Sequence, residues 1–255
     1  MKTALITGAT SGIGKAIALR LARENYALIL TGRRNDRLDE LKKEIELGYE
    51  TNVLTLCFDV RVYEQVEKAL NTLPDEFQPI DILVNNAGLA AGFDPIHSAS
   101  LTDWEQMIDT NIKGLLYVTR VVSPGMVARK SGHIVNIGSM AGKTVYPNGS
   151  VYCATKHAVK ALNTGMRMDL LPYGIRVTEI SPGAVDTEFS LVRFKGDQQR
   201  ADKVYQGFTP LYAEDIAESV YFAVSQPPHI NIQDVLIMPT AQADATMIYR
   251  KQAEF

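Results

Sequence analysis

Cysteine is scarce in this chain of 255 residues, which contains only Cys57 and Cys153. The two lie far apart and form no C-x-x-C pair, so the sequence offers neither a disulfide framework nor a cysteine-based metal site. The four histidines show no metal-ligand spacing either. We therefore expect two reduced thiols, no metal site and a cytoplasmic protein.

Long apolar runs and an excess of positive charge are also missing. No run reaches the roughly 18 apolar residues that a membrane helix needs, and the apolar stretch at residues 4–6 is too short for a signal peptide. The formal net charge of −3 argues against a nucleic-acid partner, which requires a basic surface. We expect neither a membrane nor a nucleic acid as partner.

What the chain does contain is a regular alternation of short apolar runs with helical patterns. The strand-like runs cover residues 3–6, 27–30, 53–58, 80–84, 133–137, 175–180 and 234–238. The helical patterns cover residues 12–23, 36–47, 62–73, 101–128, 150–171 and 213–225. Strands that alternate with helices form parallel sheets with helices on both faces. The sequence therefore predicts an α/β fold with one doubly wound parallel sheet of about seven strands.

No linker, repeat or shift in composition divides the chain, so we expect residues 1–255 to form a single domain. The polar residues 184–206 follow a predicted strand, on the side where parallel sheets bind ligands, and we interpret them as a lid segment. The tail, residues 239–255, is either frayed or packed across the active site or a subunit interface. Pro124-Gly125 should bend or end the helix over 101–128.

A glycine cluster follows the first predicted strand, with Gly8, Gly12 and Gly14 at spacings of four and two. Glycines here permit a tight turn, let backbone N–H groups approach phosphates, and let the following helix pack closely on the strand. A helix N-terminus then faces a pyrophosphate with its positive end. The cluster alone is weak evidence, since a simple tight turn requires the same residues. With the residues below, it predicts a dinucleotide site.

The second predicted strand is followed by Arg33 and Arg34 and by no nearby acid before Asp36. An acid at this place accepts hydrogen bonds from the ribose 2′-hydroxyl of NAD. Arginines instead suit the 2′-phosphate of NADP, because they donate paired hydrogen bonds. The alternative is two solvated arginines that open a helix. We expect NADP as the cofactor.

Tyr152 and Lys156 lie four residues apart within a predicted helix, so both side chains share one face. An ammonium held beside a phenol favours the phenolate, and we expect Lys156 to lower the pKa of Tyr152. Taken alone, Tyr152 fits a half-buried helix aromatic equally well. Beside a nucleotide site, the pair indicates proton transfer coupled to hydride transfer.

At this point the chain resembles the short-chain dehydrogenase/reductase family over nearly its whole length, with a Rossmann-type fold. The motifs that carry the resemblance are Thr7-Gly8-x3-Gly12-Ile13-Gly14, Asn85-Asn86-Ala87-Gly88, Asn111, Ser139, Tyr152-x3-Lys156 and Pro182-Gly183 followed by Thr187. The resemblance implies that Tyr152 is the general acid and base and that Ser139 holds the substrate oxygen. It also implies that Lys156 holds the nicotinamide ribose and that Asn111 anchors a water molecule that relays protons to the lysine.

The same resemblance assigns the cofactor site. Asp59 would pair with the adenine amino group, residues 86–88 would lie against the adenine ribose, and Val185 and Thr187 would hold the carboxamide. The residues expected to bind cofactor are Gly8, Thr10, Ser11, Gly12, Ile13, Gly14, Arg33, Arg34, Asp59, Val60, Asn86, Ala87, Gly88, Tyr152, Lys156, Pro182, Gly183, Val185 and Thr187.

Finer likeness concerns the substrate. Residues 85–90, 108–111, 133–139 and 187–197 are similar to the bacterial NADP-dependent 3-hydroxy acid dehydrogenases, which oxidise serine, allo-threonine and 3-hydroxypropionate and reduce malonic semialdehyde. A neighbouring branch reduces sulfoacetaldehyde to isethionate. Both substrates are short anions, and Arg193 in the lid segment is suited to clamp a carboxylate or a sulfonate. The expected substrate-binding residues are Ser139, Tyr146, Tyr152 and Arg193, whereas we interpret Lys195 and Arg250 as solvated charges.

Other functions remain open at this stage. A nucleotide-sensing protein that lost its chemistry would keep the fold, and a reductase of bulky substrates would keep the catalytic residues. The family is usually tetrameric, and the helices over 101–128 and 150–171 would form one interface. We therefore expect a homotetramer that acts on a small anionic substrate.

Overall fold

The computed structural model describes residues 1–251, and seven strands within them form one parallel sheet. The strands are β1 (Thr3–Ile6), β2 (Ala27–Gly32), β3 (Val53–Cys57), β4 (Ile80–Asn85), β5 (His133–Ile137), β6 (Arg176–Pro182) and β7 (Asp234–Ile237). Their order across the sheet is β3-β2-β1-β4-β5-β6-β7. Each observed strand ends within two residues of its expected limits, and the predicted fold class is confirmed.

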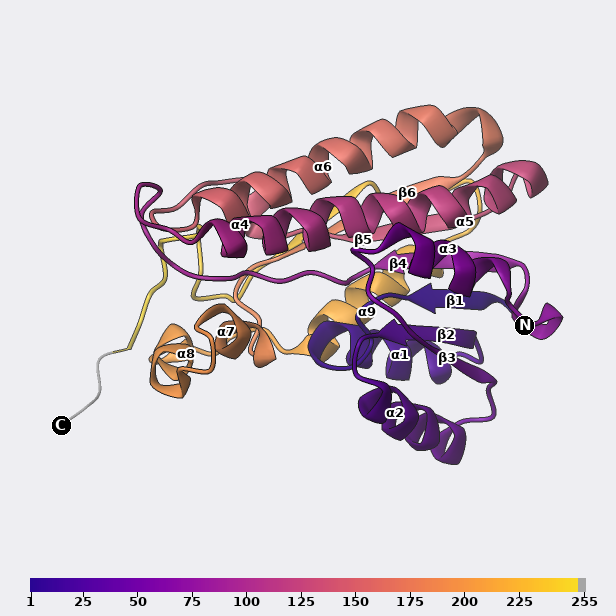
Figure 1. The fold of residues 1–255 in the computed structure, drawn as a ribbon, viewed down its shortest axis with the longest axis horizontal. Helices are drawn as coiled ribbons and strands as arrows, with labels where there is room; N and C mark the ends of the chain where they lie inside the picture. Colours follow the sequence, from indigo (N-terminus) through magenta and orange to yellow (C-terminus); the bar gives the residue numbers. More distant parts are fainter. Residues whose placement is uncertain (252–255) are drawn as a thin grey trace.

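Helices cover both faces of this sheet (Figure 1). One face carries α1 (Gly12–Ala22), α2 (Asn35–Gly48) and α9 (Ala213–Val224), and the other carries α3 (Tyr63–Asn71), α5 (Leu115–Arg129) and α6 (Ser150–Leu170). Successive strand residues point to opposite faces: Leu28 and Leu30 enter the first core, and Ile29 enters the second. Apolar residues at consecutive strand positions are therefore buried on both sides, as expected for a doubly covered sheet.

The order of the strands reverses at β1, which lies between β2 and β4. The segments that follow β1 and β4 leave toward opposite faces and open a crevice at the carboxyl edge of the sheet, where such folds bind ligands. Because all the strands are parallel, the loops after β2, β5 and β6 begin at this same edge. The glycine cluster, Ser139 and the lid segment are thereby brought together from distant parts of the chain.

The long helix predicted over 101–128 is helical throughout but not uniform. It consists of α4 (Leu101–Ile108), a π-helical segment (Asp109–Gly114) and α5. Pro124 lies inside α5, which continues to Arg129, so the helix does not end at Pro124-Gly125. Burial of Val122 and Met126 on either side of the proline holds the helix to the sheet despite the lost N–H group.

The lid segment contains two short helices that the sequence analysis did not predict, α7 (Glu188–Arg193) and α8 (Gln198–Tyr205). The tail packs against this segment. Arg250 Nη2 donates to the carbonyl of Val204 at 3.0 Å, and the Lys251 N–H donates to the carbonyl of Gly207 at 2.8 Å. A frayed tail is therefore wrong for residues 239–251, while residues 252–255 lie outside the described part of the chain.

Across residues 1–251, none of the helices combines the length and the apolar character needed to cross a membrane.

Candidate active site

The glycine cluster forms the turn between β1 and α1. Gly8 and Gly12 have φ of 66° and 51°, a left-handed conformation that side chains disfavour. At Gly14 a Cβ atom would lie only 2.3 Å from the carbonyl oxygen of Gly8, so no side chain fits there. Asn86 Nδ2 donates to the carbonyls of Thr7 and Gly8 at 2.9 and 3.1 Å. The turn is thus fastened to the loop after β4, and the N-terminus of α1 faces the crevice.

A cleft of about 360 Å³ follows this crevice along the carboxyl edge of the sheet. The residues of the predicted site that line it are Gly8, Thr10, Ser11, Gly12, Ile13, Arg33, Arg34, Asp59, Val60, Asn86, Ala87, Gly88, Ser139, Tyr152, Lys156, Pro182, Gly183, Val185 and Thr187. Gly14 and Asn111 do not line the cleft, because both lie behind its wall. Glu188, Phe189 and Val192 of α7 also line it, and the sequence analysis did not find them. Within residues 1–251, no cluster of three or more His, Cys, Asp or Glu side chains is placed to hold a metal ion.

The two arginines after β2 are held in different ways. Arg34 is fully engaged: its guanidinium donates to Thr10 Oγ1 at 2.8 Å, to Ser11 Oγ at 2.9 Å and to Glu188 Oε2 at 3.2 Å. The side chain of Arg33 is 55% exposed, and its one ion pair is a loose contact of 3.8 Å with Asp59. Arg33 therefore keeps donors for an anion at this end of the cleft, while Arg34 shapes the glycine turn.

The carboxylate of Asp59, which lines the cleft, is already engaged by the protein. Arg61, which the sequence analysis missed, donates to both carboxylate oxygens, with Nη2 at 2.6 Å from Oδ2. Burial alone would raise the pKa of Asp59, but the hydrogen bonds from Arg61 outweigh burial and lower this pKa. Asp59 is thus an ionised acceptor whose orientation is set by Arg61.

Three of the predicted catalytic side chains meet in the middle of the cleft. Tyr152 and Lys156 lie one turn apart at the beginning of α6, and each is 7% exposed. Lys156 Nζ donates to the carbonyl of Ile137, the last residue of β5, at 2.9 Å. Ser139 follows two residues later and caps a short 3₁₀ turn, where its Oγ accepts from the N–H of Ala141 at 3.0 Å. The end of β5 therefore positions both the serine and the lysine.

Asn111 lies in the π-helical segment, 2% exposed. Its Oδ1 accepts from the N–H of Leu89 at 2.9 Å, and its Nδ2 donates to the carbonyl of Leu89 at 2.8 Å and to Thr155 Oγ1 at 3.0 Å. Asn111 thus joins the loop after β4 to α6, beside the catalytic lysine. Single π turns of this kind often mark functional positions in helices.

The protonation of the catalytic pair differs from the sequence-based expectation. Burial raises the pKa of Tyr152, with opposition from the hydrogen bond of Ser139 and the charge of Arg193. Burial also lowers the pKa of Lys156, to about 8, and the charge of Glu179 opposes this shift. The sequence analysis expected a lowered pKa for Tyr152, whereas removal from water raises it.

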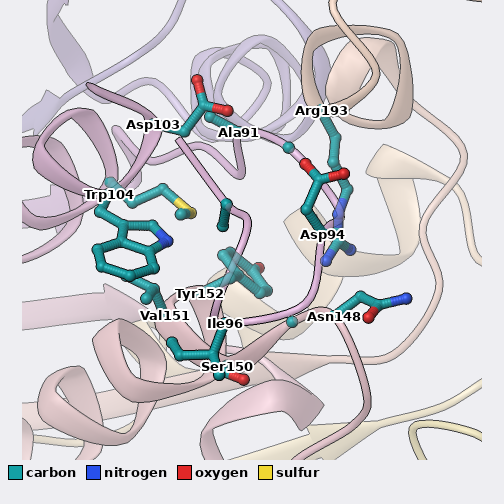
Figure 2. Close-up of a pocket in the computed structure, with 14 residues that line it drawn as sticks. Ala91, Asp94, Ile96, Asp103, Trp104, Asn148, Ser150, Val151, Tyr152 and Arg193 are labelled. Atoms are coloured by element: carbon teal, nitrogen blue, oxygen red, sulfur yellow. The ribbon is translucent and has the colours of Figure 1, made fainter. Parts of the chain in front are cut away.

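A second pocket opens on the other side of Tyr152. Figure 2 shows the Tyr152 ring in the middle of this pocket, with Trp104 on one side and Arg193 on the other. Arg193 Nη2 donates to the hydroxyl of Tyr146 at 3.0 Å, so two predicted substrate-binding residues are in contact. The guanidinium carbon lies 4.7 Å from the centre of the Phe93 ring and 5.5 Å from that of Tyr152.

The charge of Arg193 is unbalanced. Its Nε is buried without a hydrogen-bond acceptor, and none of the ion pairs among residues 1–251 involves it. A buried cationic donor without a partner is costly, and a bound anion removes this cost. The other basic residues considered earlier are engaged: Lys195 pairs with Asp103, and Arg250 donates to backbone carbonyls of the lid segment.

Comparison with known proteins agrees with this arrangement. The family described as short chain dehydrogenase matches residues 2–197. An NADP-dependent 3-hydroxy acid dehydrogenase, YdfG, from Salmonella typhi is 51% identical over 242 residues, which cover 94% of this chain and 96% of the relative. A protein of the same description from Schizosaccharomyces pombe is 44% identical over 253 residues, 99% of this chain and 98% of its own length.

Solved structures agree as well. The closed form of a serine dehydrogenase complexed with NADP⁺ is 48% identical and superimposes with a TM-score of 0.91. The match covers 98% of this chain and 100% of the other. With the glycine turn, the catalytic side chains in one cleft and these relatives, the chain belongs to the short-chain dehydrogenase family.

Proposed function

We propose that this protein is an NADP-dependent oxidoreductase that interconverts a small anionic hydroxy compound and its aldehyde or ketone. The substrate we propose is a 3-hydroxy acid: serine, allo-threonine, or 3-hydroxypropionate with its oxidised form malonic semialdehyde. The observation that carries this proposal is the guanidinium of Arg193 beside Tyr152, which has a buried Nε without an acceptor and no ion pair among residues 1–251. The names of the relatives, which include 3-hydroxy acid and serine dehydrogenases, support it.

In reduction, Tyr152 donates its phenolic proton to the substrate oxygen, and Ser139 donates a hydrogen bond to the same oxygen. Bound NADPH supplies the hydride. Because burial raises the pKa of Tyr152, the phenol stays protonated at neutral pH and is ready to act as the acid. In oxidation the phenol must first lose its proton, so that direction is favoured as the pH rises.

Lys156 lies one turn away, and with a pKa of about 8 it carries a proton at neutral pH. We assign it two tasks: it donates to the nicotinamide ribose, and it returns a proton to Tyr152 after each reduction. Asn111 holds the backbone beside Lys156 and would anchor the water molecule of this relay.

The same cleft accounts for the cofactor. Arg33 has the donors for a 2′-phosphate, and the N-terminus of α1 would hold the pyrophosphate. Val185 and Thr187 line the same cleft as Tyr152 and would hold the carboxamide. The pocket around Arg193 shares Tyr152 with this cleft, so an anion bound there would lie next to the proton donor.

Two alternatives remain, and simple assays distinguish them from the proposed activity. A sulfonate fits the same guanidinium, so an NADPH-dependent sulfoacetaldehyde reductase uses the site equally well in principle. The relatives favour the carboxylate. A non-catalytic nucleotide sensor is disfavoured, because Ser139, Tyr152 and Lys156 all line one cleft.

The family resemblance also supports a homotetramer as part of this proposal, and Leu116 and Met168 leave apolar surface exposed on α5 and α6.

The central test compares two aldehydes with NADPH as reductant. We expect kcat/KM for malonic semialdehyde to exceed that for sulfoacetaldehyde by at least about tenfold, because kcat/KM reports discrimination between transition states. Tyr152→Phe should lower turnover by roughly 100- to 10,000-fold, the usual contribution of a positioned acid, with NADPH binding retained. A reversed ratio would favour the sulfonate branch, and no NADPH oxidation with either aldehyde would contradict the oxidoreductase.

Removal of the proposed anion clamp gives a second prediction. Arg193→Ala should raise the KM for the substrate by roughly 10- to 100-fold, since a hydrogen bond to a charged group contributes about 1.5–3 kcal/mol. The Kd for NADPH should not change. Lys203→Ala, which removes a charge from an exposed position on α8 of the same lid segment, is the matched control and should leave KM unaltered. Equal KM values for Arg193→Ala and the native enzyme would remove the clamp from the proposal.

The assignment of NADP is tested at the other end of the cleft. Arg33→Asp should raise the KM for NADPH far more than that for NADH, because the new carboxylate repels the 2′-phosphate. Arg37→Gln serves as the control: Arg37 pairs with Glu188 nearby but does not line the cleft. If the ratio of the two KM values stays constant in Arg33→Asp, Arg33 does not read the 2′-phosphate.

The buried lysine predicts a conflict between stability and activity. An exposed lysine has a pKa near about 10.4, whereas Lys156 titrates at about 8. Below pH 8 the folded protein keeps a buried charge that costs free energy, and this cost disappears as the pH rises toward the unfolded pKa. Lys156→Met should therefore unfold at higher urea concentration than the native protein at pH 7, by roughly 1–3 kcal/mol, while losing turnover.

This gain should shrink between pH 8 and pH 10, because the native lysine loses its charge over that range. Urea titrations of the native protein and of Lys156→Met at pH 8 and at pH 10, without cofactor, measure this difference in the free energy of unfolding. Lys160→Met, an exposed position on the same helix, is the control and should show no such change with pH. A stability difference that is the same at both pH values would show that the lysine is not destabilised by burial.

A further inference from the structure

We propose that Asp103 and Lys195 form a positioning pair that holds Arg193 in the substrate pocket. The proposal deepens the proposed function, since it takes Arg193 as the group that binds the substrate anion. Neither member of the pair contacts the reacting atoms. Asp103 belongs to the first turn of α4, and Lys195 follows α7 in the lid segment, so the pair links two segments 92 residues apart.

The ion pair has one buried partner. Lys195 Nζ lies 2.9 Å from Asp103 Oδ2, and the side chain of Asp103 is 9% exposed whereas that of Lys195 is 61% exposed. An ion pair between two solvated side chains contributes little. Loss of the cation from a buried carboxylate has a larger effect, because the remaining charge is left without its partner. Asp103 therefore gives the lid segment a fixed point at the rim of the pocket (Figure 2).

The backbone around the pair is arranged to fit it. Lys195 has φ of 55°, a left-handed conformation that residues other than glycine adopt at a cost. Gly92 has φ of 72°, and a Cβ atom there would lie 2.7 Å from Asp103 Oδ2. The carboxylate thus lies directly over Gly92, which must be glycine for the ion pair to form.

A second link fixes the same stretch of chain. The N–H of Gly92 donates to the carbonyl of Arg193 at 3.0 Å. The main chain of Arg193 is therefore bonded to the loop that Asp103 covers, and Lys195, two residues later, is bonded to Asp103 itself. These two contacts hold residues 193–195 to the loop between β4 and α4.

The position of this backbone decides where the Arg193 guanidinium lies. Phe93, next to Gly92, packs under the guanidinium, and Phe194 packs against the edge of the same ring at a centroid distance of 6.2 Å. If the end of α7 separates from the loop, the guanidinium loses this contact and its place beside Tyr152. We therefore expect loss of the ion pair to weaken substrate binding and to leave the chemical step and the cofactor unaffected.

The pair also explains why two cations so close in sequence have different tasks. The ammonium of Lys195 is neutralised by Asp103, so it adds no attraction for a substrate anion. Arg193 has no such partner among residues 1–251 and remains the anion donor. Asp94 also lines this pocket and forms no ion pair with Arg193, so the guanidinium remains the group that we assign to the substrate anion.

The test is a double-mutant cycle of Asp103 and Lys195, in which KM is measured in the native protein and in the Arg193→Ala variant. Lys195→Met and Asp103→Asn should each raise the KM for malonic semialdehyde about fivefold, the upper range for a pair with one exposed partner. We expect kcat and the Kd for NADPH to stay within about twofold of the native values, as befits a loss of binding alone. The double variant should resemble either single variant, because both remove the same contact. In the Arg193→Ala background neither substitution should raise KM further, since the pair acts through Arg193.

The control is Lys42→Met with Glu46→Gln, an exposed ion pair of 3.6 Å on α2, which should leave KM unchanged. Native KM in Lys195→Met, additive effects in the double variant, or an undiminished effect in the Arg193→Ala background would each overturn the proposal. Because Lys195 is mostly exposed, its variant is informative even if Asp103→Asn does not fold. Failure of the proposed function is recognised separately, as absence of NADPH turnover in the native protein.

Discussion

The hydrogen bond from Lys156 to the carbonyl of Ile137 is the contact on which the arrangement of the site depends. It fixes the first turns of α6 to the end of β5, two residues before Ser139. The close approach is built into the backbone, since a Cβ atom at Gly142 would lie 2.7 Å from the carbonyl oxygen of Lys156. Without the hydrogen bond from Lys156, the distance between Ser139 in the loop after β5 and Tyr152 on α6 would not be fixed.

This contact requires a buried ammonium, and the rest of the site is organised around that requirement. Burial of Lys156 lowers its pKa to about 8, which brings its proton into the range where exchange at neutral pH is easy. Burial of Tyr152 raises the tyrosine pKa and keeps the phenol as an acid. The phenol and the ammonium are therefore both protonated at pH 7, and a reduction that consumes one proton finds a second beside it.

The fold could be predicted from the sequence because it depends on local periodicity, and all seven strands were found at their expected places. The spacing of Tyr152 and Lys156 placed both side chains on one face of α6 for the same reason, and both line the cleft. The raised pKa of Tyr152 could not be predicted, because burial is a property of the whole chain and not of a neighbour four residues away. The sequence predicted that the helix bends or ends at Pro124-Gly125. It does not end there, because packing of α5 on the sheet outweighs a local preference. Lys195 was taken as solvated because nothing near it in the sequence identifies Asp103 as its partner.

The cofactor and the proposed substrate are thus bound by parts of the chain that are under different structural constraints. The cofactor cleft is lined by turns at strand ends, where glycines without room for a Cβ atom leave little freedom. The substrate pocket is completed by the lid segment, which is held by side-chain contacts such as Asp103–Lys195 and by the tail through Arg250. Side-chain contacts can be exchanged without rebuilding the sheet. Substrate preference in such a protein can therefore change by substitution in the lid segment and the tail while the nucleotide site and the catalytic face of α6 are kept.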